Sequence, residues 1–213
     1  MEVKYMRVDK VIVRAAVSTL AAILVLFAVM ILALSFIFPS TMMQIAYDLG
    51  MDGASVTCAK RAYAQTDETY YIAFATQVAI ASDNDEQIED CGLHFIGDDP
   101  QAFDKYCTDY QEKLDGMNGT YDQYVYGQVS LAQYRQGKTA EAVTTAFTGL
   151  HSAFPKNNAA VILAMTAVNA NDAVTVSLIK TEMNELSKSL TADTDKAYLA
   201  QVLALCERGW ING

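Results

Sequence analysis

An uninterrupted apolar run near the N-terminus constrains this chain more than any other feature. Residues 15–38 read AAVSTLAAILVLFAVMILALSFIF, which is 24 residues with no charge and only three hydroxyl side chains. A helix of this length measures roughly 36 Å at ~1.5 Å per residue, and the hydrocarbon core of a bilayer is about 30 Å thick. We therefore predict a single transmembrane helix over 15–38, ended by Pro39, which has no N–H for the helical ladder.

A cleaved signal peptide is the alternative interpretation of this run. The apolar core of a signal peptide usually has about 7–15 residues and ends in a small-x-small cleavage site. The run here is longer, and no such site follows it directly. These two differences favour an uncleaved signal anchor that contacts the lipid bilayer through residues 15–38.

The basic residues around the run predict its orientation. Lys and Arg occupy positions 4, 7, 10 and 14, and the next basic residue after the run is Lys60. Cytoplasmic flanks of membrane helices carry the excess of Lys and Arg. We therefore expect residues 1–14 in the cytoplasm and residues 41–213 as an extracytoplasmic domain.

The chain beyond the run is acidic. Past residue 40 there are 23 acidic and 11 basic residues, and twelve of the acids lie between positions 83 and 122. Neutralising the phosphates of a nucleic acid needs a surface of Lys and Arg, so no nucleic-acid partner is expected. The acidic segment is either a solvated helical face or a docking surface for a basic partner or a cation.

The domain is predicted to be all-α, because apolar residues recur at helical spacing and no segment alternates as a strand would. Asp83 with Glu86 resembles a capping box, and Asp67 and Asp172 are further candidate helix starts. The expected helices cover residues 41–49, 52–65, 67–81, 84–97, 100–115, 121–136, 139–153, 157–169, 172–189 and 193–208.

The segment from Tyr126 to Pro155 resembles a tetratricopeptide (TPR) repeat, a pair of antiparallel helices in about 34 residues. Small side chains let the two helices of such a pair approach closely. The residues that carry the resemblance are Tyr126 at the aromatic position, Val129 and Ser130 at the Leu-Gly pair, Gly137 at the turn, Ala142 and Gly149 at the small positions, and Pro155, one place late.

Parts of the same pattern recur along the chain. Residues 50–57 echo residues 137–144 through Gly-x4-Ser/Ala-Val-Thr, and residues 173–175 echo the Ala-Val-Thr block that begins at Ala142. A fourth segment that resembles the second helix of the repeat lies near residues 88–91. The recurrence favours a TPR-like antiparallel helix-pair array over an unrelated helical bundle, the other architecture that this pattern allows.

The resemblance implies a non-enzymatic scaffold, because TPR proteins grip peptides or partner helices on a concave surface built from their first helices. Tyrosine provides a large contact area with a polar tip, although tyrosines at helical spacing also pack at helix contacts. The candidate groove residues are Tyr70, Tyr71, Tyr124, Leu131, Tyr134 and Arg135.

We therefore expect a membrane-anchored scaffold or assembly factor that binds other proteins, themselves membrane-associated, as a homo- or hetero-oligomer. A permanent structural subunit of a larger membrane complex is the alternative. Fixed, stable stoichiometry with its partners would distinguish such a subunit from a scaffold that acts as a transient adaptor.

No sequence motif predicts an enzyme, a cofactor or a metal site. The acidic run at 83–90 does not fit an EF-hand, since Ile88 stands where that loop requires Gly. Cys91 and His94 lie three residues apart on one helical face, which is the arrangement of a thiol nucleophile and its base. A thiol enzyme using this pair is the enzymatic alternative.

The chain has four cysteines, and an even number permits disulfides outside the cytoplasm. The separation between Cys58 and Cys91 is close to one repeat length of about 34 residues, which would place them on neighbouring second helices and makes them a candidate pair. Four cysteines allow three complete pairings, and the sequence does not choose among them. The alternative is that all four cysteines are buried thiols that pack as small apolar side chains.

The predicted orientation can be tested by protease digestion. A membrane-impermeant protease added to intact cells or spheroplasts should remove residues 41–213 and leave a short fragment that contains the apolar run. Complete protection of the domain in intact cells, with digestion only after the membrane is opened, would show the opposite orientation.

Overall fold

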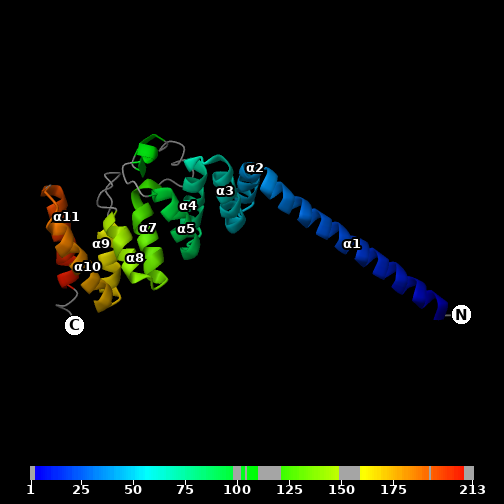
Figure 1. Cartoon of the computed structure of the whole chain (residues 1–213). Coiled ribbons are helices and arrows are strands. Elements are labelled where there is room, and N and C mark those ends of the chain that lie inside the picture. The colour runs from blue at the N-terminus through cyan, green and yellow to red at the C-terminus, as the bar shows by residue number, and fades with distance from the viewer. Residues whose placement is uncertain are drawn as a thin grey trace.

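The computed structural model describes residues 3–97, 102–103, 105–109, 121–148, 159–191 and 193–208, and within these ranges it contains helices and no strand. The predicted all-α class is therefore confirmed. One long helix, α1 (Val3–Ile37), extends from the end of a row of shorter helices (Figure 1). The remaining described helices are α2 (Pro39–Asp48), α3 (Asp52–Thr66), α4 (Thr69–Ala81), α5 (Asp85–Ile96), α7 (Tyr121–Arg135), α8 (Thr139–Thr148), α9 (Ala159–Asn169), α10 (Ala173–Ser187) and α11 (Asp193–Arg208).

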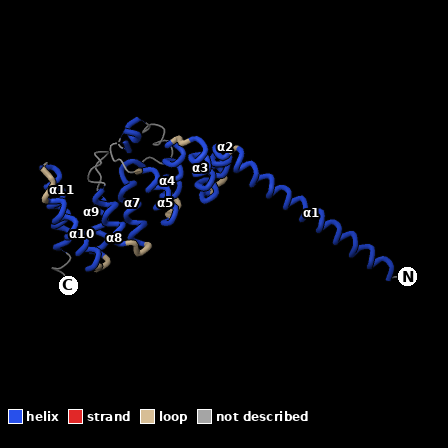
Figure 2. Tube along the Cα trace, in the orientation of Figure 1, coloured by secondary structure: helices blue, strands red, loops and turns tan. Residues whose placement is uncertain are grey.

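The shorter helices are stacked in the order in which they occur along the chain. From α2 to α5, and again from α7 to α11, each described helix packs against the next, and α5 packs against α7. Further contacts join α7 to α9, α8 to α10 and α9 to α11. Figure 2 shows the resulting row, in which the tan connections alternate between its two edges. Each described helix of the row thus packs against the next one along the chain, and in the second half also against the next but one.

Four helix pairs in the described part of the chain turn in the same way. The turn residues Gly50, Asp83, Gly137 and Asn171 have positive φ angles of 69°, 50°, 79° and 54°. Each turn residue donates its backbone N–H to the carbonyl three residues back, and the next residue donates to the carbonyl five residues back, at 2.8 to 3.2 Å. This is the Schellman motif, in which a left-handed residue satisfies the free carbonyls of a helix end. We call these four the hairpin turns.

The two hairpin turns in each half of the row are the same distance apart, to within one residue. The turns at 50 and 83, and those at 137 and 171, are separated by about 34 residues, and the longer interval between them contains the connection between α5 and α7. Counted from its own turn, Val176 takes the place of Ala142, so the predicted alignment of Ala173 with Ala142 was wrong. Ile88 takes the same place in the second pair, five residues after its turn. Sequence similarity misplaced the unit at 173–175 because Ala-Val-Thr is short and recurs by chance.

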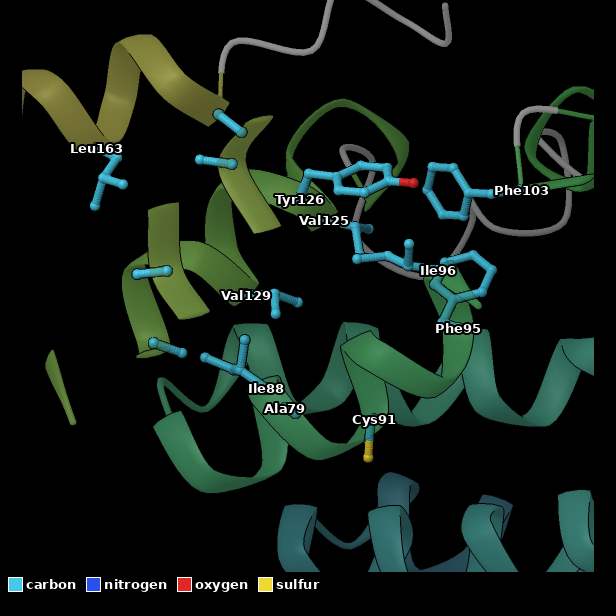
Figure 3. Packing of buried hydrophobic residues seen from close by; sticks show 14 of the residues in the cluster. Ala79, Ile88, Cys91, Phe95, Ile96, Phe103, Val125, Tyr126, Val129 and Leu163 are labelled. Atoms are coloured by element: carbon cyan, nitrogen blue, oxygen red, sulfur yellow. The ribbon is translucent and has the colours of Figure 1, made fainter. Parts of the chain in front are cut away.

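The core runs through all of the stacked helices. Figure 3 shows part of it, where Ile88 and Val129 meet between α5 and α7, with Phe95, Phe103 and Tyr126 above them. Phe103 packs edge-on against Phe95 and Tyr126, with ring centroids 5.1 and 5.4 Å apart. Burying a large apolar side chain contributes about 1.5–3 kcal/mol, so this layer joins the second and third pairs firmly.

Two predicted helix starts were wrong and one is confirmed. Asn84, not Asp83, is the N-cap of α5, and its side chain accepts a hydrogen bond from the Gln87 N–H at 3.1 Å. Asp67 has a φ of 57° and ends α3. Asp172 does cap α10, because its carboxylate accepts from the N–H groups of Val174 and Thr175. Aspartate suits both a left-handed turn and an N-cap, which is why its presence alone did not distinguish them.

A glycine substitution tests the close approach of α5 and α7. A Cβ at Gly92 would lie 2.2 Å from Cγ2 of Val129, so Gly92→Ala should cost about 1–3 kcal/mol of unfolding free energy through overpacking. At Gly53 in α3 the nearest atom, Nε2 of Gln87, would be 3.9 Å away, and Gly53→Ala should be neutral or stabilising by up to about 1 kcal/mol. Urea unfolding of the full chain in mild detergent, followed by circular dichroism, measures both. Equal effects of the two substitutions would contradict this packing.

Candidate functional site

The long helix α1 has the properties of a membrane span. Its segment Lys10–Ile37 is 28 residues long, and only 6% of its most apolar window is buried inside the protein. Large apolar side chains such as Leu24 and Leu26 are 60% and 69% exposed. An uncovered apolar helix is unstable in water, and this one is long and apolar enough to cross a bilayer.

The end of α1 is attached to α3 by side chains that are distant in sequence. Nη1 of Arg61 donates to Oγ of Ser35 at 2.6 Å, and the Ser35 hydroxyl in turn donates to the Leu32 carbonyl at 2.7 Å. The guanidinium of Arg61 also lies 3.9 Å from the ring centroid of Phe36. One turn further along α3, Nε2 of Gln65 donates to the Phe36 carbonyl at 2.8 Å. We call Ser35, Phe36, Arg61 and Gln65 the anchor junction.

The anchor junction supplies what the C-terminus of a helix lacks. The last four carbonyls of a helix have no partner within it, and Gln65 satisfies the carbonyl of Phe36. The same end carries the negative pole of the helix dipole, next to which the Arg61 cation is placed favourably. A cation over an aromatic ring adds about 0.5–2 kcal/mol, depending on solvation. The first hairpin of the row therefore caps the long helix.

Sequence reasoning did not identify the anchor junction. Arg61 and Gln65 are 26 and 29 residues away from their partners on α1. Their spacing of four residues places them on one face of α3, but nothing in the sequence says which surface that face meets. The only cue was that Lys60 and Arg61 are the first basic residues after the apolar run.

The two candidate groove tyrosines of α4 are half-buried against the core. The rings of Tyr70 and Tyr71 meet edge-on with centroids 5.5 Å apart, and Tyr70 also lies 6.5 Å from the ring of Phe74. Burial, with a smaller contribution from Tyr71, raises the pKa of the Tyr70 hydroxyl. Much of the surface of both rings is therefore used in packing within the chain.

The candidate groove residues of α7 have different environments. Leu131 and Tyr134 are half-buried, and the Tyr134 hydroxyl lies near the carboxylate of Asp172, the cap of α10. Burial and the Asp172 carboxylate both raise the pKa of the Tyr134 hydroxyl. The side chain of Tyr124 lies outside the part of the chain that the structure describes. Tyr134 thus links two neighbouring helix pairs while its ring stays partly accessible.

Arg135 is held by acidic residues at the second hairpin turn. Its Nε donates to both carboxylate oxygens of Asp85, at 2.8 and 3.0 Å, and its Nη2 lies 3.2 Å from Oδ1 of Asp83. A two-pronged contact of this kind is the most specific form of ion pair. The charge of this candidate is therefore neutralised inside the chain.

The acidic segment is partly neutralised in the same way. Lys138 pairs with Glu89, and Lys60 pairs with Asp90. Nε2 of Gln136 donates to Oε2 of Glu89 at 2.9 Å. Within the described residues of this segment, much of the charge on α5 thus joins neighbouring helices, and an exposed pair of this kind is worth about 0–1 kcal/mol.

Cys58 and Cys91 occupy equivalent positions, eight residues after the hairpin turns at Gly50 and Asp83. The predicted spacing of one repeat therefore holds for these two residues. Both are buried free thiols, so the candidate disulfide is not formed in this structure. This is the state that the alternative interpretation of buried thiols describes.

The surroundings of Cys91 do not favour a thiolate. Cys91 is fully buried, and desolvation raises its pKa to about 12. Nδ1 of His94 lies 2.7 Å from the Asp90 carbonyl, and the His94 side chain is 58% exposed. A nucleophilic thiol needs the opposite conditions, namely partial exposure and a lowered pKa. No cluster of three or more potential metal ligands occurs in the described ranges.

No family model, no curated protein and no solved structure matches this chain. The features that bear on its function are therefore its own: four similar helix pairs, a long apolar helix and the junction between them.

Thiol alkylation tests the buried cysteines. Because desolvation raises the pKa values of Cys58, Cys91 and Cys206, iodoacetamide at pH 8 should leave these thiols unmodified in the native protein. Unfolding in guanidinium without reductant should then expose all four cysteines to alkylation, counted by mass spectrometry. Rapid native modification of Cys91 would revive the thiol-enzyme alternative, and a requirement for reductant would show a disulfide.

Proposed function

We propose that this protein is a membrane-anchored, non-enzymatic scaffold that holds partner proteins at the outer face of the membrane on a TPR-like helical array. The observation that carries the proposal is the repetition of one helix hairpin four times, in chain order, beside a helix suited to a bilayer. Stacked hairpins present a long continuous surface, and such a surface serves to bind other macromolecules.

The burial pattern supports a TPR-like packing of the pairs. Counted back from each hairpin turn, the residues at the eleventh, seventh and fourth positions are buried in all four first helices. They are Pro39, Ile72, Tyr126 and Ala160, then Met43, Thr76, Ser130 and Ala164, then Ala46, Ala79, Gln133 and Ala167. The spacing of the first two and of the last two hairpin turns also agrees with the period of about 34 residues in that repeat. Both observations support extending the TPR resemblance from one unit to four.

Two further positions form a partly accessible strip on the same helices. The third position before each turn is half-buried in every pair, and the sixth ranges from buried to exposed. The strip consists of Tyr47, Ile80, Tyr134 and Val168 at the third position and Gln44, Gln77, Leu131 and Met165 at the sixth. None of the eight is charged, although the domain carries an excess of twelve negative charges. We call these residues the uncharged strip.

The uncharged strip indicates the chemistry of the partner. Apolar and aromatic side chains bind other apolar side chains by excluding water, and they do not require a charged ligand. The strip includes Leu131 and Tyr134 on α7 and Met165 and Val168 on α9, and these two helices pack together. Met165 is 48% exposed. The preferred partner segment is therefore an apolar or aromatic peptide or helix, bound across α7 and α9.

The anchor has a separate role in this proposal. A scaffold confined to the membrane surface meets membrane-bound partners at a raised effective concentration, so moderate affinity is sufficient. The basic flank before the apolar run supports the orientation with the array outside. Both features fit a protein that brings membrane-associated partners together.

Site-specific photo-crosslinking tests the strip. A benzoyl-phenylalanine placed at Leu131 or Met165 in living cells should form adducts with particular proteins, identified by mass spectrometry. The matched control is Val174 on α10, which is 68% exposed but lies outside the strip. Additional Leu131→Glu substitution should reduce the adduct at 165 at least several-fold. Adducts that are equal at 165 and 174, or absent from the strip, would contradict the proposed binding face.

A further inference from the structure

A small apolar patch lies where the array meets the anchor. Outside α1 and Phe38, the described residues include eight large apolar side chains that are exposed, and three of these fall within seven residues. Ile45, Leu49 and Met51 are 45%, 69% and 55% exposed. The other five are spread over α5, α9, α10 and α11. We call Ile45, Leu49 and Met51 the turn patch, since they surround the first hairpin turn.

The turn patch has a fixed position relative to α1. It belongs to α2 and the turn that follows, and α1 packs against both α2 and α3. The anchor junction attaches α3 to the last turn of α1 through Arg61 and Gln65, and buried Oγ of Ser55 in α3 donates to the Met43 carbonyl of α2 at 3.0 Å. The long helix, α2 and α3 are therefore held together as one unit rather than joined by a loose linker.

The anchor junction also indicates the depth of the unit in a bilayer. Arg61 is charged and touches Ser35 and Phe36, so this level belongs to the interface and not to the hydrocarbon core. Arg14 marks the other interface. The stretch of helix from position 14 to position 35 rises about 31 Å, which matches a core of ~30 Å. The aromatic rings of Phe36 and Phe38 lie at the outer boundary, where aromatic residues are enriched.

The three residues of the turn patch lie only ten to sixteen residues after Ser35, which marks that boundary. Proline at position 39 begins a new helix, so α2 leaves the line of α1 instead of carrying these side chains straight out into solvent (Figure 1). In Figure 1 α1 leaves the row at the end formed by α2 and α3, against which it packs. The turn patch belongs to α2 and the turn after it, so it lies at the end of the array nearest the membrane helix.

We propose that Ile45, Leu49 and Met51 insert into the headgroup region of the outer leaflet as a second lipid contact. This inference rests on the proposed anchoring by α1. The contact is apolar, because Asp48 and Asp52 flank it and the domain as a whole is acidic, so anionic lipids do not attract it. With two contacts, α1 and the turn patch, the array is held at a set orientation to the membrane surface.

Fluorescence quenching in nanodiscs tests the lipid contact. The full chain in phosphatidylcholine nanodiscs is labelled with an NBD fluorophore at Leu49→Cys or Met51→Cys, with Val174→Cys as the exposed control and Leu24→Cys as the reference within the span. The wild-type chain, treated with the same NBD reagent, measures the background labelling of its four buried native cysteines. Labels at 49 and 51 should be quenched by lipids with headgroup-level nitroxides, and iodide should quench them at least three-fold less than the label at 174.

The outcomes separate the lipid contact from the anchor. If the labels at 49 and 51 are as accessible to iodide as the label at 174, while the label at 24 is quenched by lipid, the second contact is overturned and the anchor stands. If the label at 24 is also reached by iodide, both the anchor and the second contact fail. Replacing phosphatidylcholine by anionic lipid should not strengthen the quenching by lipid at 49.

A substitution at the anchor junction tests how the patch is held. Arg61→Ala with Gln65→Ala should raise the iodide quenching at 49 toward the value at 174 and leave position 24 unchanged. Lys60→Ala is the matched control, since Lys60 is on the same helix but pairs with Asp90. Unchanged quenching in the double variant, with circular dichroism showing a folded domain, would contradict the role of the junction.

Discussion

The left-handed residue at each hairpin turn is the constraint on which the rest of this structure depends. At Gly50, Asp83, Gly137 and Asn171 the chain ends one helix with the same two backbone hydrogen bonds and starts the next on the opposite course. Identical turns bring identical positions of the two helices into contact, so each pair buries the same faces. Pairs that bury the same faces can stack on one another in chain order, and this gives an extended row instead of a closed bundle.

The first helix pair contacts α1 as well as the next pair of the row, because α3 caps the end of α1. Gln65 donates to the Phe36 carbonyl, one of the last carbonyls that a helix leaves without a partner, and Arg61 donates to the Ser35 hydroxyl in the same turn. The same contacts place a charge at the level where the apolar surface ends. The orientation of the long apolar helix relative to the array is therefore set by these side chains, and a change at this junction is expected to alter orientation more than stability.

The sequence was sufficient for features that depend on local composition. The apolar run predicted α1, and the glycines at 50 and 137 marked two of the four turns, since glycine adopts positive φ at no cost. Asp83 and Asn171 were not recognised as turns because their types also suit helix starts. Contacts between residues that are distant in the sequence could not be predicted, for a different reason. Arg135 was predicted to face a partner, yet its charge is met by Asp85, 50 residues away, and no periodicity reveals such a pair.

The proposed role as a scaffold is tested most directly by the mass of the particle extracted from its native membrane in mild detergent. Native mass spectrometry should find the 23.3 kDa chain together with other proteins, and these should be lost when Leu131→Glu and Met165→Glu disrupt the uncharged strip. A constant ratio of partners would indicate a permanent subunit, and a variable ratio an adaptor. A particle that contains only the 23.3 kDa chain under every mild extraction condition would contradict the proposed function.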